Sequence, residues 1–196
     1  MKLLAITLLL ITLPFMANAQ DAKTFTLDND KSTMTIEGGS TVGSWDADVN
    51  LIDGTFAINL DALENGNGTA FDLTTFSVDV SKIESDSRRM NRNISSYLKE
   101  DDHPKIYFTL NGAEVADSDA NVYNVSVSGV INAAGADKEV SFTTKAELKD
   151  DGSIVLSGVK ELLFSDFGID RPSAMLGTVR ASEEIEIHYN LVLVAQ

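Results

Sequence analysis

The last segment of the chain alternates between apolar and polar residues with a period of two. The apolar members are Ile185, Ile187, Tyr189, Leu191 and Leu193, and the polar residues between the first of them are Glu184, Glu186, His188 and Asn190. Because successive side chains of a β-strand point to opposite faces, this pattern predicts a long antiparallel strand with one face in a core and the other in water.

The same alternation recurs from Lys23 onward, which predicts an all-β protein. Further inward-facing sets are expected at Phe56, Ile58 and Leu60; Phe71, Leu73 and Phe76; Ile106, Phe108 and Leu110; Tyr123, Val125, Val127 and Ile131; Phe142, Ala146 and Leu148; and Ile154 and Leu156. Segments rich in Asn, Asp and Gly separate these sets at 28–31, 64–68, 116–119, 134–137 and 150–153. Such residues tolerate the positive φ of tight turns, so we expect a meander of about eight strands that closes into a barrel or a sandwich.

One segment, 85–102, breaks the alternation. Its apolar residues recur at helical spacing: Met90, Ile94, Tyr97 and Leu98. Ser85 or Asp86 is expected to cap the start, and Pro104 disfavours helix in the residue before it. We therefore predict one helix or two short helices here, lying across one mouth of the barrel with the apolar stripe turned inward as a lid.

The N-terminus has the features of a signal peptide. A positive residue precedes an apolar run at 3–15, and Ala17 and Ala19 occupy the −3 and −1 positions of a cleavage site. A membrane anchor is the alternative, but the run is shorter than the roughly 20 residues that a bilayer crossing needs. We predict that 1–19 is removed and that 20–196 forms one domain in a periplasmic or secreted protein.

Composition excludes several classes of function. The chain has no cysteine, so disulfides, thiolate metal sites and cysteine nucleophiles are excluded. The formal net charge is −15, which disfavours nucleic acid and anionic membrane surfaces as partners and is consistent with a solubilising surface. The one dense cluster of positive charge is Arg88, Arg89 and Arg92.

No catalytic or metal-binding motif stands out. His103 and His188 are isolated and have no ligand-like spacing, and no serine lies in a Gly-x-Ser-x-Gly pattern. Acidic pairs such as 46/48, 101/102 and 183/184 fall in turns or on outward faces, where solvated charge is expected. No glycine-rich phosphate loop opens a helix after a strand. These observations predict a protein that is not an enzyme and has no metal or nucleotide cofactor.

The interior of the barrel remains as the functional candidate. A barrel of about eight strands is wide enough either to be filled by its own side chains or to enclose one elongated apolar ligand. An inward row of Phe, Leu, Ile and Val does not by itself choose between a filled core and a pocket, because every β domain has such a face.

Four segments, in this order, give the chain a resemblance to the YceI-like family. They are GSTVGSW at 39–45 with Gly54-Thr55-Phe56; FSVDVSKIESDSRRMNRNISSYLKEDDHPKIYFTL at 76–110; VSGVINAAGADKEVSF at 127–142; and FSDFGID at 164–170, before the last strand. Members of this family are exported, lipocalin-like barrels that bind polyisoprenoid-type lipids. The resemblance thus implies an antiparallel up-and-down β-barrel and an apolar or amphiphilic ligand, such as an isoprenoid or a quinone, as partner.

If the resemblance holds, the barrel interior is a lipid tunnel. Its expected lining is Trp45, Phe56, Phe71, Met90, Ile94, Leu98, Phe108, Phe142, Phe164 and Phe167. A polar or phosphorylated head group would meet Arg88, Arg89 and Arg92 at the mouth. Two alternatives stay open: a filled barrel that acts through surface interactions in adhesion or stress protection, and an enzyme with carboxylates at the mouth. The sequence does not decide whether the protein forms a homodimer.

Overall fold

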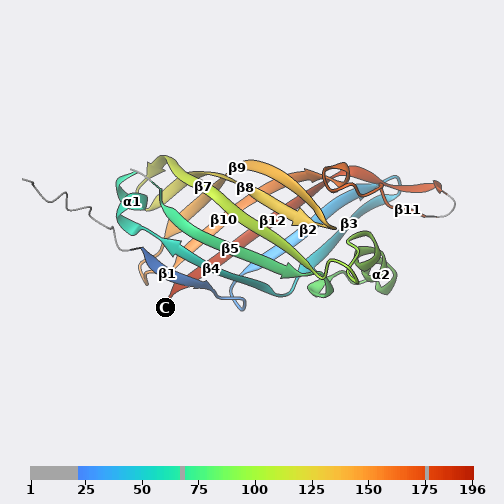
Figure 1. Cartoon of the computed structure of the whole chain (residues 1–196), viewed down its shortest axis with the longest axis horizontal. Coiled ribbons are helices and arrows are strands. Elements are labelled where there is room, and N and C mark those ends of the chain that lie inside the picture. Colours follow the sequence, from blue (N-terminus) through green and yellow to red (C-terminus); the bar gives the residue numbers. More distant parts are fainter. Residues whose placement is uncertain (1–21, 67–68, 175–176) are drawn as a thin grey trace, which may run out of the picture.

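The computed structural model describes residues 22–66, 69–174 and 177–196, and the expected signal peptide at 1–19 lies outside them. The chain forms a long antiparallel barrel (Figure 1). Its strands are β1 (Lys23–Leu27), β2 (Thr33–Ser40), β3 (Gly43–Val49), β4 (Ile52–Ile58), β5 (Phe71–Asp79), β6 (Ile83–Glu84), β7 (Lys105–Asp119), β8 (Val122–Ala133), β9 (Ala136–Leu148), β10 (Ile154–Leu163), β11 (Ser173–Ala174) and β12 (Val179–Ala195). The helices are α1 (Leu60–Asn65) and α2 (Arg88–Tyr97), with 3₁₀ turns η1 (Val80–Lys82) and η2 (Phe164–Phe167).

The barrel closes as the meander predicts. Strands β1, β4, β5, β7, β8, β9, β10 and β12 follow one another around the wall, and β12 pairs with β1 to complete the ring. Toward α2, other strands continue three positions of the ring. There β2 follows β1 and pairs with β12, β3 precedes β4 and pairs with β2, and β6 follows β5 and pairs with β3. Three of the eight positions in the ring are thus each divided into two strands, which gives eleven strands, and the twelfth, β11, pairs with β12 outside the ring. The expectation of an eight-stranded up-and-down barrel is confirmed.

The tight turn between β8 and β9 follows from its two central residues. Ala134 and Gly135 have φ of 52° and 82°, and Ala133 pairs with Ala136 across the turn. Two successive positive φ values suit the right-handed twist of a hairpin. In contrast, the turn expected at 116–119 is strand: β7 runs to Asp119, and the reversal falls at Ala120, whose φ is 53°.

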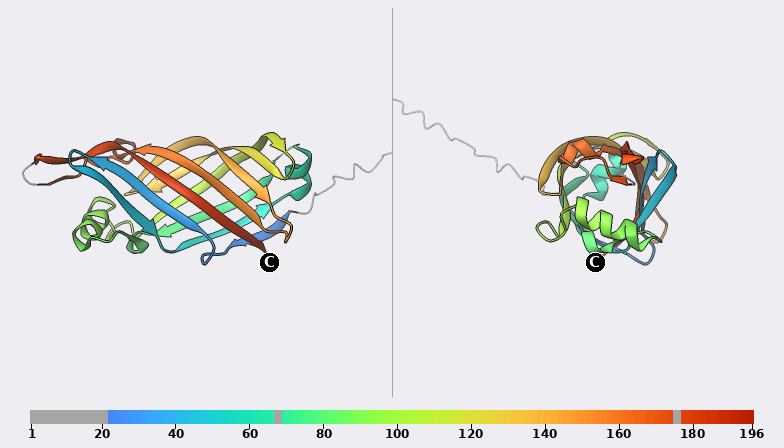
Figure 2. Two further views of the ribbon diagram at one scale, coloured as in Figure 1. Left: turned by 180° about the vertical axis from the view of Figure 1, so that it is seen from behind. Right: turned by 90° about the vertical axis from the view of Figure 1, so that its right-hand side faces the viewer.

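The helix predicted at 85–102 is present as α2, and it lies at one end of the barrel across part of the opening (Figures 1 and 2). The cap is Ser87, whose Oγ accepts a hydrogen bond from the Met90 N–H at 3.4 Å, so the expectation of Ser85 or Asp86 was wrong by one or two residues. Ser85 instead accepts and donates bonds with the Asn91 side chain, which ties the preceding loop to the helix.

The other end of the barrel carries α1, which the alternation did not predict. Leu60 was expected in a strand and 64–68 as a turn, but the chain is helical from Leu60 to Asn65. The Asn59 Oδ1 accepts from the Ala62 N–H at 2.9 Å, and Gly66 ends the helix with φ 62°. Leu63 is fully buried, so α1 plugs this end.

The ladder between β9 and β10 is one of the shortest in the barrel wall. These strands pair only over the stretch from Ile154↔Leu148 to Ser157↔Lys145, although β10 continues to Leu163 and β9 begins at Ala136. On their other sides both strands are paired along their length, β9 with β8 and β10 with β12. Beyond Ser157 the two strands therefore separate, and η2 packs over the far part of this seam.

Candidate functional site

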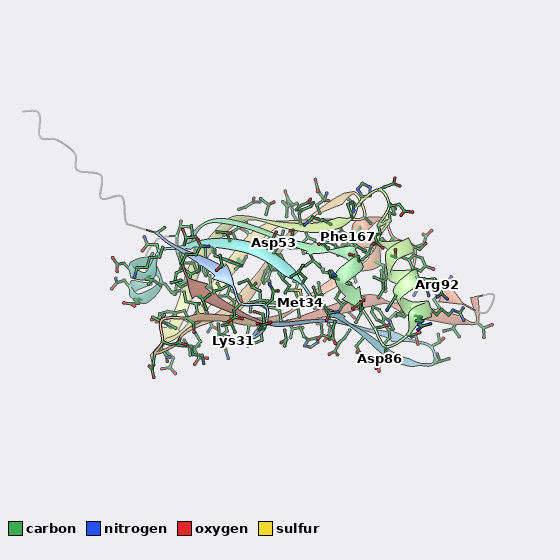
Figure 3. The ribbon with its side chains drawn as sticks, turned by 90° about the horizontal axis from the view of Figure 1, so that it is seen from below. Lys31, Met34, Asp53, Asp86, Arg92 and Phe167 are labelled. Carbon is green, nitrogen blue, oxygen red and sulfur yellow. The ribbon has the colours of Figure 1, made fainter. Side chains whose placement is uncertain are left out.

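The barrel encloses an apolar cavity, named here the barrel cavity. Its volume is about 180 Å³. Its lining comes from strands around the wall and includes Met34, Phe56, Phe71, Phe108, Phe142 and Leu191. Figure 3 shows Met34 inside the barrel, between its two ends. The inward face of the last strand also contributes, because Ile187, Tyr189 and Leu191 line the cavity as their spacing predicts.

A second cavity, the mouth cavity, lies beneath α2 and has a volume of about 270 Å³. Met90, Ile94 and Tyr97 of α2 line it, together with Leu98 directly after the helix. Polar side chains join the wall here: Ser40, Asn93 and Ser173. Ile36 and Ile83 line both cavities, so the two spaces adjoin. Together they form an apolar interior that becomes more polar toward α2.

The structure distributes the predicted lining residues over both cavities. Phe56, Phe71, Phe108 and Phe142 line the barrel cavity, and Trp45, Met90, Ile94, Leu98 and Phe164 line the mouth cavity. The remaining residue, Phe167, lies instead in a small core cluster with Val140, Leu162 and Ile169. Phe167 belongs to η2, which turns its ring toward the β8–β9 hairpin. Whether the other nine touch a ligand stays a prediction.

Three aromatic rings lie against glycines of the wall. Trp45 covers its cross-strand partner Gly38, and Tyr189 covers its partner Gly158. A Cβ on Gly38 would lie 2.3 Å from the Trp45 ring, and one on Gly158 would lie 2.6 Å from the Tyr189 oxygen. Phe108 lies against Gly129, which is two residues away from its cross-strand partner Ile131. The missing Cβ atoms let these rings rest on the backbone, so the interior stays open where larger residues would push the rings inward.

Two polar atoms of these rings are buried and have no hydrogen-bond partner among the described residues: Trp45 Nε1 and the Tyr189 hydroxyl. Burial raises the pKa of Tyr189, and the neighbouring Thr144 hydroxyl opposes this rise without completing a hydrogen bond to it. Thr144 Oγ1 donates instead to the Ser157 carbonyl, at 3.3 Å. An unpaired buried polar atom costs about 1–3 kcal/mol, so both atoms are available to pair with a water molecule or a polar group of a ligand.

The η2 corner anchors the wall near the mouth. The Asp166 carboxylate accepts from the Leu163 N–H at 3.0 Å and forms an ion pair with Lys138. Burial raises the pKa of Asp166, but the Lys138 ammonium and the Leu163 N–H outweigh it and leave the pKa below its usual range. The FSDFGID segment is thus a charged, hydrogen-bonded corner that ends at Gly168, whose φ is 62°.

The predicted head-group arginines lie on α2 and are exposed to solvent. Arg92 projects from this helix at the end of the barrel (Figure 3). Neither cavity is lined by Arg88, Arg89 or Arg92. Within the described ranges, the arginine that forms an ion pair is Arg171, with Glu183 at 3.4 Å. The three arginines therefore present free positive charge outside the mouth.

Sequence reasoning missed one charged lining residue, Lys160 on β10. Its position was readable in principle, since Lys160 shares the inward phase of Ile154 and Leu156 and pairs with the inward Ile187. The alternation was counted only over apolar residues, so a lysine at an inward position was passed over.

Some other kinds of site find no support in the part of the chain that the structure describes. No group of three or more His, Asp or Glu side chains there is placed to hold a metal ion. His188 contacts Glu186 at 2.9 Å on the outer face, as its outward phase predicts. None of the described helices combines the length and apolar character needed to cross a bilayer.

A closed eight-stranded antiparallel barrel with an apolar interior defines the class of lipocalin-like barrels. The model of the YceI-like domain matches residues 25–193. The chain therefore belongs to the YceI-like family, and the resemblance seen in the sequence is confirmed. No curated protein matches the chain significantly.

Solved structures share this fold at low sequence identity. BcnA of Burkholderia cenocepacia is 16% identical, with a TM-score of 0.64, over 85% of this chain and 98% of BcnA. A polyisoprenoid binding domain from Saccharophagus degradans, implicated in plant cell wall breakdown, is 10% identical, with a TM-score of 0.66, over 88% and 98%. The YceI protein of Campylobacter jejuni is 14% identical, with a TM-score of 0.58, over 76% and 84%.

Proposed function

We propose that this protein binds the hydrocarbon chain of an isoprenoid, a quinone or a comparable amphiphile inside the barrel, and that it holds or carries this ligand without catalysis. The observation that carries the proposal is the pair of adjoining cavities lined almost entirely by apolar side chains. This room favours a hollow barrel over the alternative of a filled core with a purely surface function.

The physics of binding follows from the lining. Each Å² of apolar surface removed from water contributes about 25 cal/mol, so a long chain gains affinity without a hydrogen bond. Selectivity then depends on the width and length of the interior, which the rings over Gly38, Gly129 and Gly158 keep open. The Saccharophagus domain, named for polyisoprenoid binding, shares the fold and supports an isoprenoid chain as the ligand class.

The mouth beneath α2 is the route that we propose for exchange. Met90, Ile94 and Leu98 cover the mouth cavity, while no residue of α2 is fully buried. The thioether of Met90 adapts to guests of different shape. Outside the mouth, Arg88, Arg89 and Arg92 would attract anionic ligands over a distance of about 10 Å at moderate salt. Direct contact between these arginines and a head group stays a prediction.

We propose a periplasmic or secreted location, with 1–19 as the signal peptide. Positive charge before a short apolar run and alanines at the −3 and −1 positions support this location. N-terminal sequencing of the protein recovered from its host would place the cleavage after Ala19. An intact N-terminus on the recovered protein would contradict the proposal.

The main test is native mass spectrometry of the mature protein, purified from its host without detergent and measured again after solvent extraction. We expect one bound apolar compound per chain, with mass spacings of isoprene units across its forms. A ligand-free protein that also takes up neither solanesol nor ubiquinone on incubation would contradict the proposal.

A pair of substitutions separates the cavity from the surface. Phe108→Asp and Ile94→Asp place a charge in the barrel cavity and the mouth cavity, and both should abolish ligand retention while the far-ultraviolet β-sheet spectrum survives. Val42→Asp is the matched control, because Val42 is 74% exposed at the β2–β3 turn. If native mass spectrometry shows that both cavity variants retain the ligand, the proposed binding inside the barrel is contradicted.

A further inference from the structure

The seam between β9 and β10 forms a window in the side of the barrel. The last backbone pair before the window is Ser157↔Lys145, and η2 covers its other end, where Lys138 pairs with Asp166. Between these limits β9 and β10 have no backbone ladder, and their four residue pairs make this one of the shortest ladders in the ring. Backbone groups that face an unpaired stretch must find solvent or side chains, so the wall here is thin.

Two side chains bridge the window in place of the ladder. Thr144 Oγ1 donates to the Ser157 carbonyl at 3.3 Å, and Lys160 Nζ donates to the Ser141 carbonyl at 3.4 Å. Both bonds are long compared with the usual 2.9 Å, so they are weak and easily exchanged. The window therefore opens at a smaller cost than any fully paired part of the wall.

The barrel cavity reaches this window. Phe142, Thr144, Leu156 and Lys160 all line the cavity, and the first two belong to β9 and the last two to β10. Phe142 also borders a groove on the outer face, formed with the hydroxyls of Ser141 and Thr143. Val127 and Phe142 line both this groove and the barrel cavity, so the wall formed by β8 and β9 is thin beside the window.

Lys160 supplies a positive charge at this place. It is the charged residue among those that line the two cavities. Its ammonium lies 6.0 Å from the centre of the Phe142 ring. Among the described residues it has no ion-pair partner within 4.0 Å, although the net charge of the chain is −15. The aliphatic part of the side chain lines the cavity and the ammonium reaches the window, which is the arrangement of a snorkelling lysine.

We propose that this window is a head-group site, in which Lys160 holds an ionised oxygen of a single-chain amphiphile whose chain lies in the barrel cavity. The ligand class is a long-chain carboxylic acid or phosphate. When such a ligand binds, Lys160 exchanges its weak bond to the Ser141 carbonyl for a charge-assisted bond to the head group. This exchange favours binding of an anionic head group over a neutral one. This inference rests on the proposed binding of a chain in the barrel, but it places the head group at the side wall and not at the α2 mouth.

The test compares two probes with the same chain, geranylgeranoic acid and geranylgeraniol, by competition with tritiated geranylgeraniol at neutral pH. We expect the intact protein to bind the acid about tenfold more tightly than the alcohol, as one charge-assisted bond provides. Lys160→Gln should remove this preference and change the dissociation constant of the alcohol by no more than about twofold, which also shows that the variant is folded. Lys160→Arg should keep the preference.

Two control variants locate the effect. Lys145→Gln removes the same charge from an exposed residue of β9 and should retain the tenfold preference. The triple change R88Q/R89Q/R92Q should also retain it. If Lys160→Gln leaves the preference unchanged, or if the arginine variant loses it, the head group does not lie at the window and the inference is overturned. If the intact protein binds neither probe, the proposed function itself fails.

Discussion

The two ends of the barrel are each covered by a helix, but the two helices differ in how they are held. In α1 the Leu63 side chain is fully buried and Ala62 is 3% exposed. In α2 no residue is buried, although the helix is longer. A helix with a buried anchor is part of the core, and a helix without one opens at a lower free energy. The α1 end is therefore held as part of the core, and the α2 end opens at a lower free energy.

The largest expected difference between the ends is in stability. Leu63→Ala should lower the free energy of unfolding by about 3 kcal/mol, because it leaves a cavity in the core. Ile94→Ala on α2 should cost about 1 kcal/mol or less, since the side chain is only partly buried. Urea unfolding followed by circular dichroism measures both. Equal losses would remove the distinction between plug and lid.

Acid should act on the mouth end through Asp166. Its folded pKa lies below the usual 3.8, so its stabilisation is complete above about pH 5 and is lost as the pH falls through 3.8 toward the folded pKa. Asp166→Asn should lower the free energy of unfolding by about 1.5 kcal/mol at pH 7 and by much less at pH 2.5. Thermal unfolding across this pH range tests the expectation. A loss that does not depend on pH would contradict it.

The two helix caps give a smaller contrast. Asn59→Ala should cost about 1 kcal/mol, because a buried N–H of α1 loses its partner. Ser87→Ala should cost about half as much, since its bond to the Met90 N–H is 3.4 Å long and exposed. Chemical denaturation of the two variants in parallel provides the comparison. A greater loss from Ser87→Ala would show that α2 is held more firmly than its burial indicates.

The smallest expected effect on stability comes from the arginines of α2. R88Q/R89Q/R92Q should change the free energy of unfolding by about 0.5 kcal/mol or less, because the side chains are exposed and do not pair with described carboxylates. The same variant should slow the capture of an anionic ligand at low salt and have little effect at high salt. Stopped-flow binding at two salt concentrations would show this, and identical rates for variant and parent would exclude steering by these residues.

Most of the barrel was predictable because its signals are local. The period of two in β12, the positive-φ pair at the β8–β9 turn and the apolar stripe of α2 can each be read without knowing any partner strand. The α1 helix was missed because Leu60 continues the phase of Phe56 and Ile58. Asn59 and Gly66, which cap the two ends of α1, were the available signal.

The candidate site was predictable in part for the same reason. Inward phase identified Phe56, Phe108 and Phe142, and helical spacing identified Ile94 and Leu98. Phe167 lies in a 3₁₀ turn and packs into a small core cluster outside both cavities, so its contact with a ligand stays a prediction. No periodicity shows that a ring will rest on a glycine of the next strand, because this depends on register.

By itself, the sequence determined the all-β class, the number of strands around the barrel, the lid helix and the apolar character of the interior, because hydrophobic periodicity and turn chemistry act over a few neighbouring residues. Only the tertiary structure decided that the interior is hollow, that α1 and α2 close its ends differently, and that β9 and β10 part beside Lys160. These features depend on which distant residues meet across the wall, and that is fixed by the register and closure of the whole sheet.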